Sequence, residues 1–120
     1  PGSAQLTGQA KKLIRLVAKI ARSLPNEITI SGHTDSSSFS DLNERTNWEL
    51  SMERANSARR ELQIYKIPDK RIESVVGLAD KLPLLAGAPK NSANRRISIV
   101  LLREKLKIKE AKPPKPPRVL

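Results

Sequence analysis

Two charged residues, Asp35 and Arg54, have the types and positions expected of a binding site. Asp35 follows a predicted strand, and Arg54 lies two turns into the next predicted helix. In open α/β sheets, ligands tend to bind beyond the carboxyl ends of strands, where loops and helix N-termini meet. A guanidinium binds a carboxylate through two parallel hydrogen bonds, and a carboxylate pairs with an ammonium. The pair would therefore recognise a ligand that carries both charges, with no nucleophile in the site.

Simpler interpretations of these residues stay open. From spacing alone, an internal salt bridge between Asp35 and Arg54 is as good an interpretation as ligand binding. His33, the sole histidine, is more often a locally hydrogen-bonded turn residue than a base or a metal ligand, and no metal site is predicted. Serines 36–38 lack the strained G-x-S-x-G elbow of hydrolases. Trp48 can stack on a sugar, but in a first helical turn it more commonly anchors a loop.

The first predicted element is an amphipathic helix from Leu6 to Leu24, which Pro25 ends. Its apolar residues recur at steps of three and four, which predicts one inward face. That face comprises Leu6, Ala10, Leu13, Val17, Ile20 and Leu24. Residues 27–32 then alternate β-branched and polar side chains, as in a half-buried strand. The polar loop at 33–46 that follows is long enough to indicate a function.

A second helix is predicted from a T-x-x-E capping box at Thr46 and Glu49, and it ends near Ile64, before Pro68. Its inward stripe is Met52, Ala55, Ala58 and Leu62. Because a helix connects the strand before it with the strand after it, those two strands must be parallel.

The remaining elements complete a small α/β fold. Residues 71–79 are the second strand, residues 82–85 a short helical turn, and residues 97–102 a last strand whose two apolar faces predict burial on both sides. The fold class is therefore a two-layer α/β sandwich, in which two main helices pack on a mixed three-stranded sheet. In chain order this is a βαββ core preceded by a helix.

The net charge of +11 over 120 residues is distributed unevenly. Residues 1–24 carry +5, residues 25–102 only +1, and residues 103–120 again +5. A nucleic-acid-binding domain would concentrate basic residues and stacking aromatics on its folded surface, so nucleic acid is not a predicted partner. No stretch approaches the ~20 apolar residues that cross a bilayer, so membrane contact by this chain is not predicted either. The absence of Cys excludes disulfides and thiolate metal sites.

One domain, residues 4–103, is predicted between two dissimilar ends. Residues 1–3, Pro-Gly-Ser, are typical of the remnant of an expression tag. Residues 104–120 form a basic tail whose proline pairs exclude helix and ladder, so we expect it to be disordered.

Four ordered motifs resemble the OmpA-like peptidoglycan-binding domain, over roughly residues 6–102. They are I-S-G-H-T-D from Ile30, N-x-x-L-S-x-x-R-A from Asn47, V-G-x-A-D-x-x-P from Val76 and N-R-R-I from Asn94. The resemblance implies a non-catalytic domain, without a cofactor, that binds the stem peptide of peptidoglycan.

The same resemblance implies which residues bind. The diamino acid of the stem peptide, usually meso-diaminopimelate, would be held by Asp35 and Arg54, with help from Asn47, Thr34 and Arg95. Two departures from the family pattern bear on this. The enlarged loop at 36–45 leaves the position of Asp35 to be determined, and the first strand of the family is missing.

Residues 47–51, behind the enlarged loop, resemble most closely the family members of flagellar motor stators. This implies a periplasmic homodimer, tethered to the inner membrane, that works with MotA and for which flagellar ring proteins are further candidate partners. The membrane helix with its proton-carrying Asp is absent from the sequence given. An alternative function is a protein-interaction and dimerisation module of the stator with wall binding gated off, carried by the long loop and the basic first helix.

Overall fold

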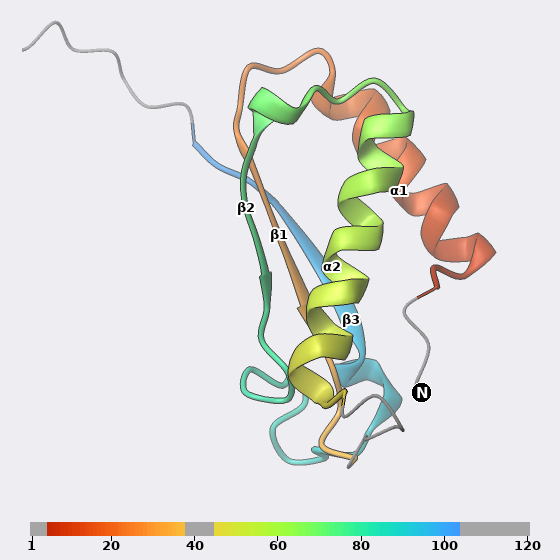
Figure 1. Ribbon diagram of the computed structural model, residues 1–120, viewed down its shortest axis with the longest axis vertical. Coiled ribbons are helices and arrows are strands. Elements are labelled where there is room, and N and C mark those ends of the chain that lie inside the picture. Colours follow the sequence, from red (N-terminus) through yellow and green to blue (C-terminus); the bar gives the residue numbers. More distant parts are fainter. Residues whose placement is uncertain (1–4, 38–44, 104–120) are drawn as a thin grey trace, which may run out of the picture.

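The computed structural model describes residues 5–37 and 45–103 (Figure 1). The expected tag remnant, the basic tail at 104–120 and most of the loop at 36–45 lie outside these described residues. The elements are two long helices, three strands and two short 3₁₀ turns. In chain order they are α1 (Gly8–Ala21), β1 (Ile28–His33), α2 (Asn47–Ile64), η1 (Asp69–Arg71), β2 (Ile72–Gly77), η2 (Ser92–Asn94) and β3 (Arg96–Leu101).

The strands form a mixed sheet in the order β2-β1-β3. β1 is parallel to β2 and antiparallel to β3, as the crossover connection requires. α2 packs on β1 and β2, and α1 packs against α2 from its outer side (Figure 1). The predicted two-layer sandwich of two helices on a mixed three-stranded sheet is therefore confirmed. Among the described residues, β2 and β3 are the edge strands of this sheet.

α2 begins as predicted and lies very close to the sheet. Thr46 and Glu49 form the capping box: the Thr46 hydroxyl accepts a hydrogen bond from the Glu49 backbone amide, and the Glu49 carboxylate accepts one from the Thr46 backbone amide. A Cβ on Gly32 would overlap the carbonyl oxygen of Ser51, and one on Gly77 would lie 2.5 Å from the backbone nitrogen of Met52. Two strand glycines therefore admit the helix backbone to the sheet.

This close approach decides which residues of α2 are buried. Ala55, Ala58 and Leu62 are buried as predicted, but the stripe continues to Ser51 rather than to Met52, which is 40% exposed. The prediction for Met52 was wrong because the small Ser51 fits opposite the glycines and turns Met52 to the flank. Ser51 also fixes the end of β2, since its hydroxyl accepts a hydrogen bond from the Ala79 backbone at 3.0 Å.

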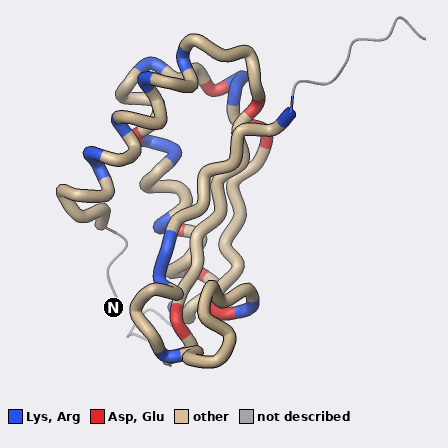
Figure 2. The backbone as a smooth tube through the Cα atoms, turned by 180° about the vertical axis from the view of Figure 1, so that it is seen from behind, with Lys and Arg blue, Asp and Glu red and all other residues tan. Residues whose placement is uncertain are grey.

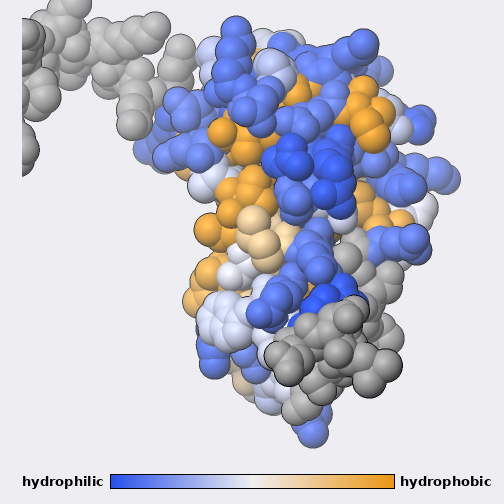
Figure 3. Space-filling model, viewed as in Figure 1, coloured by the Kyte–Doolittle hydropathy of each residue, from blue (hydrophilic) through white to orange (hydrophobic). Residues whose placement is uncertain are grey.

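The predicted inward face of the first helix was right for Leu6 and Val17, which pack against the core, and wrong for most of its other residues. α1 is shorter than Leu6 to Leu24 and buries Ile14, Ala18 and Ala21, a stripe rotated from the predicted one. Two small alanines allow α1 to approach α2 closely, which the larger side chains would prevent. The large apolar residues lie outside, with Leu13, Leu16, Ile20 and Leu24 between 39% and 60% exposed. On the face of the molecule seen in Figure 3, most side chains are hydrophilic, and apolar side chains gather on α1 and along the β2 flank.

Two further expectations were wrong. β3 has no fully buried residue, and Val100 is 50% exposed, because both helices cover the same face of the sheet. Residues 82–85 are not helical; the 3₁₀ turn of this loop forms at Ser92–Asn94 instead. Asn94, fully buried, binds the loop internally through its amide to the Ala88 carbonyl at 2.9 Å.

The C-terminus of α2 provides a stability prediction. Lys66 has a φ of 75°, and the Ile67 and Lys66 backbone amides donate to the carbonyls of Leu62 and Gln63, which is a Schellman motif. A side chain in this left-handed position is unfavourable, so Lys66→Gly should raise the free energy of unfolding by about 1 kcal/mol. Urea unfolding measures it, with Lys66→Ala as the control that keeps the backbone strain. Equal stability of the two variants would contradict the explanation.

Candidate functional site

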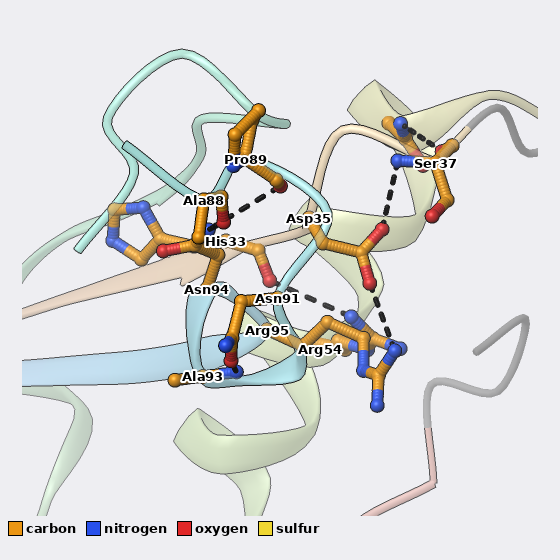
Figure 4. Close-up of polar contacts among 11 residues, drawn as sticks. His33, Asp35, Ser37, Arg54, Ala88, Pro89, Asn91, Ala93, Asn94 and Arg95 are labelled. Carbon is orange, nitrogen blue, oxygen red and sulfur yellow. Dashed lines mark hydrogen bonds and ion pairs between the residues drawn. The ribbon is translucent and has the colours of Figure 1, made fainter. Parts of the chain in front are cut away.

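Asp35 lies just past β1, almost covered, with both carboxylate oxygens engaged (Figure 4). Oδ1 accepts from the Ser37 backbone amide and Oδ2 from Arg95 Nη1, both at 2.8 Å. Its side chain is 6% exposed, whereas that of Arg95 is 34% exposed. Burial raises the pKa of Asp35, but the hydrogen bonds from Ser37 and Arg95 outweigh it and hold the pKa below its ordinary value. Asp35 is therefore a charged carboxylate with an internal partner.

Arg54 is a second guanidinium beside this ion pair. It projects from α2 toward the end of β1, where its Nη1 lies 3.5 Å from the carbonyl oxygen of His33 (Figure 4). Burial lowers the pKa of Arg54, the charge of Arg95 lowers it further, and the charge of Asp35 opposes both. The salt bridge considered between Asp35 and Arg54 is thus made by Arg95, and the site holds one carboxylate and two guanidinium groups.

The register of the sheet explains why Arg95 reaches Asp35. β1 and β3 pair antiparallel with His33 opposite Arg96, so the residue before Arg96 lies beside the residues that follow His33. Two long-range backbone hydrogen bonds hold the flanking loops in place: the Thr34 amide donates to the Ala79 carbonyl at 2.8 Å, and the Ser36 amide to the Pro89 carbonyl at 2.9 Å. The carboxyl ends of the parallel strands therefore meet there, as expected.

The other two predicted site residues flank the same loop. The Asn47 amide donates to the Ser37 carbonyl at 3.0 Å, from the exposed first turn of α2. Thr34 is buried, and its hydroxyl has no hydrogen-bond partner among the described residues. The other four predicted residues thus lie around Asp35. The sequence did not reveal that Ser51 and Asn94 hold the loops beside the site through hydrogen bonds to Ala79 and Ala88. The only signal for this role was that both residues belong to the quoted motifs.

The two arginine side chains also take part in lining a groove beside the site. Arg54 and Arg95 line one end of a groove of about 600 Å³ between α1 and β3. The rest of the lining is mainly apolar: Gln5, Leu6, Thr7, Ala10, Leu13, Ile14, Val17, Arg96, Ile97 and Ile99. Figure 2 shows basic residues along α1 and both charge signs at the loop end of the sheet. A solute can therefore approach the guanidinium groups, while Asp35 lies behind them. Within the described ranges, no cluster of His, Cys, Asp or Glu could hold a metal.

His33 is the last residue of β1, rather than the turn residue expected, and it is buried. Its Nε2 lies 3.0 Å from the Ser31 hydroxyl, and its Nδ1 has no partner among the described residues. Burial lowers the pKa of His33 from 6.5, and the charge of Arg96 lowers it further. The folded protein therefore keeps His33 neutral where the unfolded chain already binds a proton.

This difference predicts acid sensitivity. The stabilising contribution of neutral His33 is complete above the unfolded pKa and is lost as the pH falls through the folded one. The free energy of unfolding should therefore be lower at about pH 5 than at about pH 8. Urea titrations at both pH values measure it. His33→Gln should reduce the difference, and an unchanged difference in that variant would assign the acid sensitivity to other groups.

Residues 1–96 match the model of the OmpA family, and this chain belongs to that family. The chain is 36% identical over 102 residues to Motility protein B of Escherichia coli K12, covering 84% of this chain and 33% of that protein. The predicted resemblance to flagellar stator members is confirmed by this homology. The chain thus spans about a third of the length of that curated relative.

Two solved structures extend the comparison. The C-terminal domain of Helicobacter pylori MotB superposes with a TM-score of 0.75, at 20% identity, over 86% of this chain and 80% of that one, and shows the shared fold. The peptidoglycan-associated lipoprotein of Burkholderia pseudomallei superposes with a TM-score of 0.69, at 29% identity, over 83% of each chain. Neither α1 nor α2 has the length and apolar character of a membrane-crossing helix.

Proposed function

We propose that this chain is the periplasmic, peptidoglycan-binding domain of a MotB-type flagellar stator protein, and that it anchors the stator to the cell wall without catalysis. The observation that carries the proposal is the carboxylate of Asp35 beside two guanidinium groups at the carboxyl end of the sheet. Membership of the OmpA family, homology to Motility protein B and the likeness to a peptidoglycan-associated lipoprotein support it.

The ligand is the diamino acid of the stem peptide. The side chain of diaminopimelate ends in a carbon that carries both an ammonium and a carboxylate. Arg54 and Arg95 bind the carboxylate and Asp35 accepts the ammonium, because these are the charge-assisted pairs that the three side chains can form. Asn47 and Thr34, on either side of Asp35, contribute polar contacts.

Affinity at one site is modest. A hydrogen bond to a charged group contributes about 1.5–3 kcal/mol, and part of this offsets the ordering of peptide and side chains. The full-length protein then holds the wall through avidity, since we propose that it is a homodimer, fixed in the inner membrane with MotA, on a polymeric wall. Weak single sites with strong overall retention are the expected pattern.

Purified sacculi and soluble wall peptides test this function. The protein should co-sediment with sacculi, and a diaminopimelate-containing tripeptide should shift the amide resonances of Asp35, Asn47 and Arg54. The same peptide should compete with sacculi for the protein. Absence of both retention and shifts would overturn the proposal.

The exposed face of α1 favours a second candidate function, association of the domain with a second copy of itself. Leu13, Leu16 and Ile20 are each more than half exposed and lie on one side of the helix. An apolar stripe of this size marks an interaction surface in many proteins. Sedimentation velocity at several concentrations tests it: a dimer that Leu16→Glu dissociates supports association, and a monomer at all concentrations removes this candidate.

A further inference from the structure

Both carboxylate oxygens of Asp35 are engaged and the side chain is almost covered, so an incoming ammonium has little access to it. Oδ1 accepts from the Ser37 backbone, which belongs to the same short turn, and Oδ2 accepts from the Arg95 guanidinium. The side chain is 6% exposed, so little of it meets solvent. A ligand reaches Asp35 only when one of these two partners leaves.

Arg95 is the partner that can leave. Its side chain is 34% exposed, it lies at the junction of η2 and β3, and it lines the open groove. The Ser37 amide, in contrast, is part of the backbone two residues from Asp35. Arg54 is placed differently, because it is partly buried on α2 and its Nη1 lies 3.5 Å from the His33 carbonyl oxygen.

A displaced guanidinium must find another anion. If the incoming group is only an amine, Arg95 loses its carboxylate and remains beside Arg54, whose like charge opposes it. If the ligand carries a carboxylate on the same carbon as its ammonium, Arg95 exchanges one carboxylate for another. Because such a ligand group adds one positive and one negative charge, binding leaves the net charge of the site unchanged.

We propose that Arg95 is a specificity-determining residue, which occupies the position of the ligand's ammonium until a ligand bearing both charges displaces it. This inference rests on the proposed function and deepens it. The site accepts stem peptides whose diamino acid ends in ammonium and carboxylate, and rejects those with lysine, which lacks the second carboxylate. Rejection comes from an internal competitor, in addition to any contact that the lysine peptide lacks.

Isothermal titration of the folded domain with two tripeptides tests the exchange. One contains diaminopimelate and the other lysine at the same position. The wild type should bind the lysine peptide at least about tenfold more weakly. Arg95→Gln removes the competitor, so its affinity for the lysine peptide should rise about three- to tenfold above wild type, while its affinity for the diaminopimelate peptide does not rise.

Matched variants separate this role from a simple contact. Arg95→Lys keeps a competing cation and should not gain affinity for the lysine peptide. Arg54→Gln removes a guanidinium of the same charge that does not bind Asp35 and should not gain it either. As a second readout, the pKa of Asp35, followed by carboxyl carbon NMR, should rise in Arg95→Gln because one of its hydrogen bonds is lost.

The outcomes are distinct. Suppose that the wild type binds the diaminopimelate peptide, but Arg95→Gln binds the lysine peptide no more tightly than the wild type does. This result would overturn the exchange and leave the proposed function standing. A wild-type protein that binds neither peptide would overturn the proposed function and this inference with it. A gain in Arg95→Gln that Arg95→Lys lacks supports the inference.

Discussion

Gly32→Ala is expected to lose about 4 kcal/mol or more of the free energy of unfolding, which is much of the total of about 5–15 kcal/mol for a domain. The added methyl group would overlap the Ser51 carbonyl oxygen and lie 3.0 Å from its carbon and 3.1 Å from the Ala55 nitrogen. All three atoms belong to the backbone of α2, so no rotamer change relieves the clash. The helix must move off the sheet, away from a core that includes Ile30, Ala55 and Ala58.

Urea unfolding followed by circular dichroism measures this loss. Gly8→Ala is the matched control, since no atom lies within 4 Å of the added methyl group at that helical position. It should be neutral or slightly stabilising, because alanine favours helix over glycine. A Gly32→Ala protein as stable as wild type would show that α2 does not need this close approach.

Arg54→Ala is expected to weaken binding of the diaminopimelate tripeptide about 100-fold and to abolish retention on sacculi. This guanidinium is one of the two positive charges of the site; its Nη1 lies 3.5 Å from the His33 carbonyl oxygen, and the side chain lines the groove. Its loss leaves the ligand carboxylate with Arg95 alone. On a polymeric wall the loss is multiplied, because each arm of a dimer is weakened.

The control for Arg54→Ala is Arg60→Ala, which removes the same charge from an exposed position of the same helix. Arg60→Ala should keep wild-type affinity, and both variants should retain the circular dichroism spectrum of the wild type. Retention on sacculi by a folded Arg54→Ala protein would rule out the proposed ion pairing. Equal losses in both variants would instead indicate general charge attraction to an acidic wall.

Local chemistry and periodicity predicted much of this fold because they act within a few residues. The capping box at Thr46 and Glu49 is formed by neighbouring side chains, and the parallel pairing of β1 with β2 follows from the helix between them. The position of Asp35 after β1 was predicted in the same way. Packing faces were less predictable: α1 buries Ile14, Ala18 and Ala21 and leaves Leu13, Leu16 and Ile20 exposed, because the face that it buries depends on the shape of α2.

The amino-acid sequence by itself determined which main elements form, where the polar loops fall among them, and that a carboxylate follows the first strand while arginines lie on the next helix and just before the last strand. Only the tertiary structure decided that Asp35 pairs with Arg95, 60 residues away, rather than with Arg54. That choice depends on the antiparallel register that sets His33 opposite Arg96. Register is a property of the assembled sheet, since it is chosen by the burial of whole strand faces rather than by any residue's neighbours in the chain.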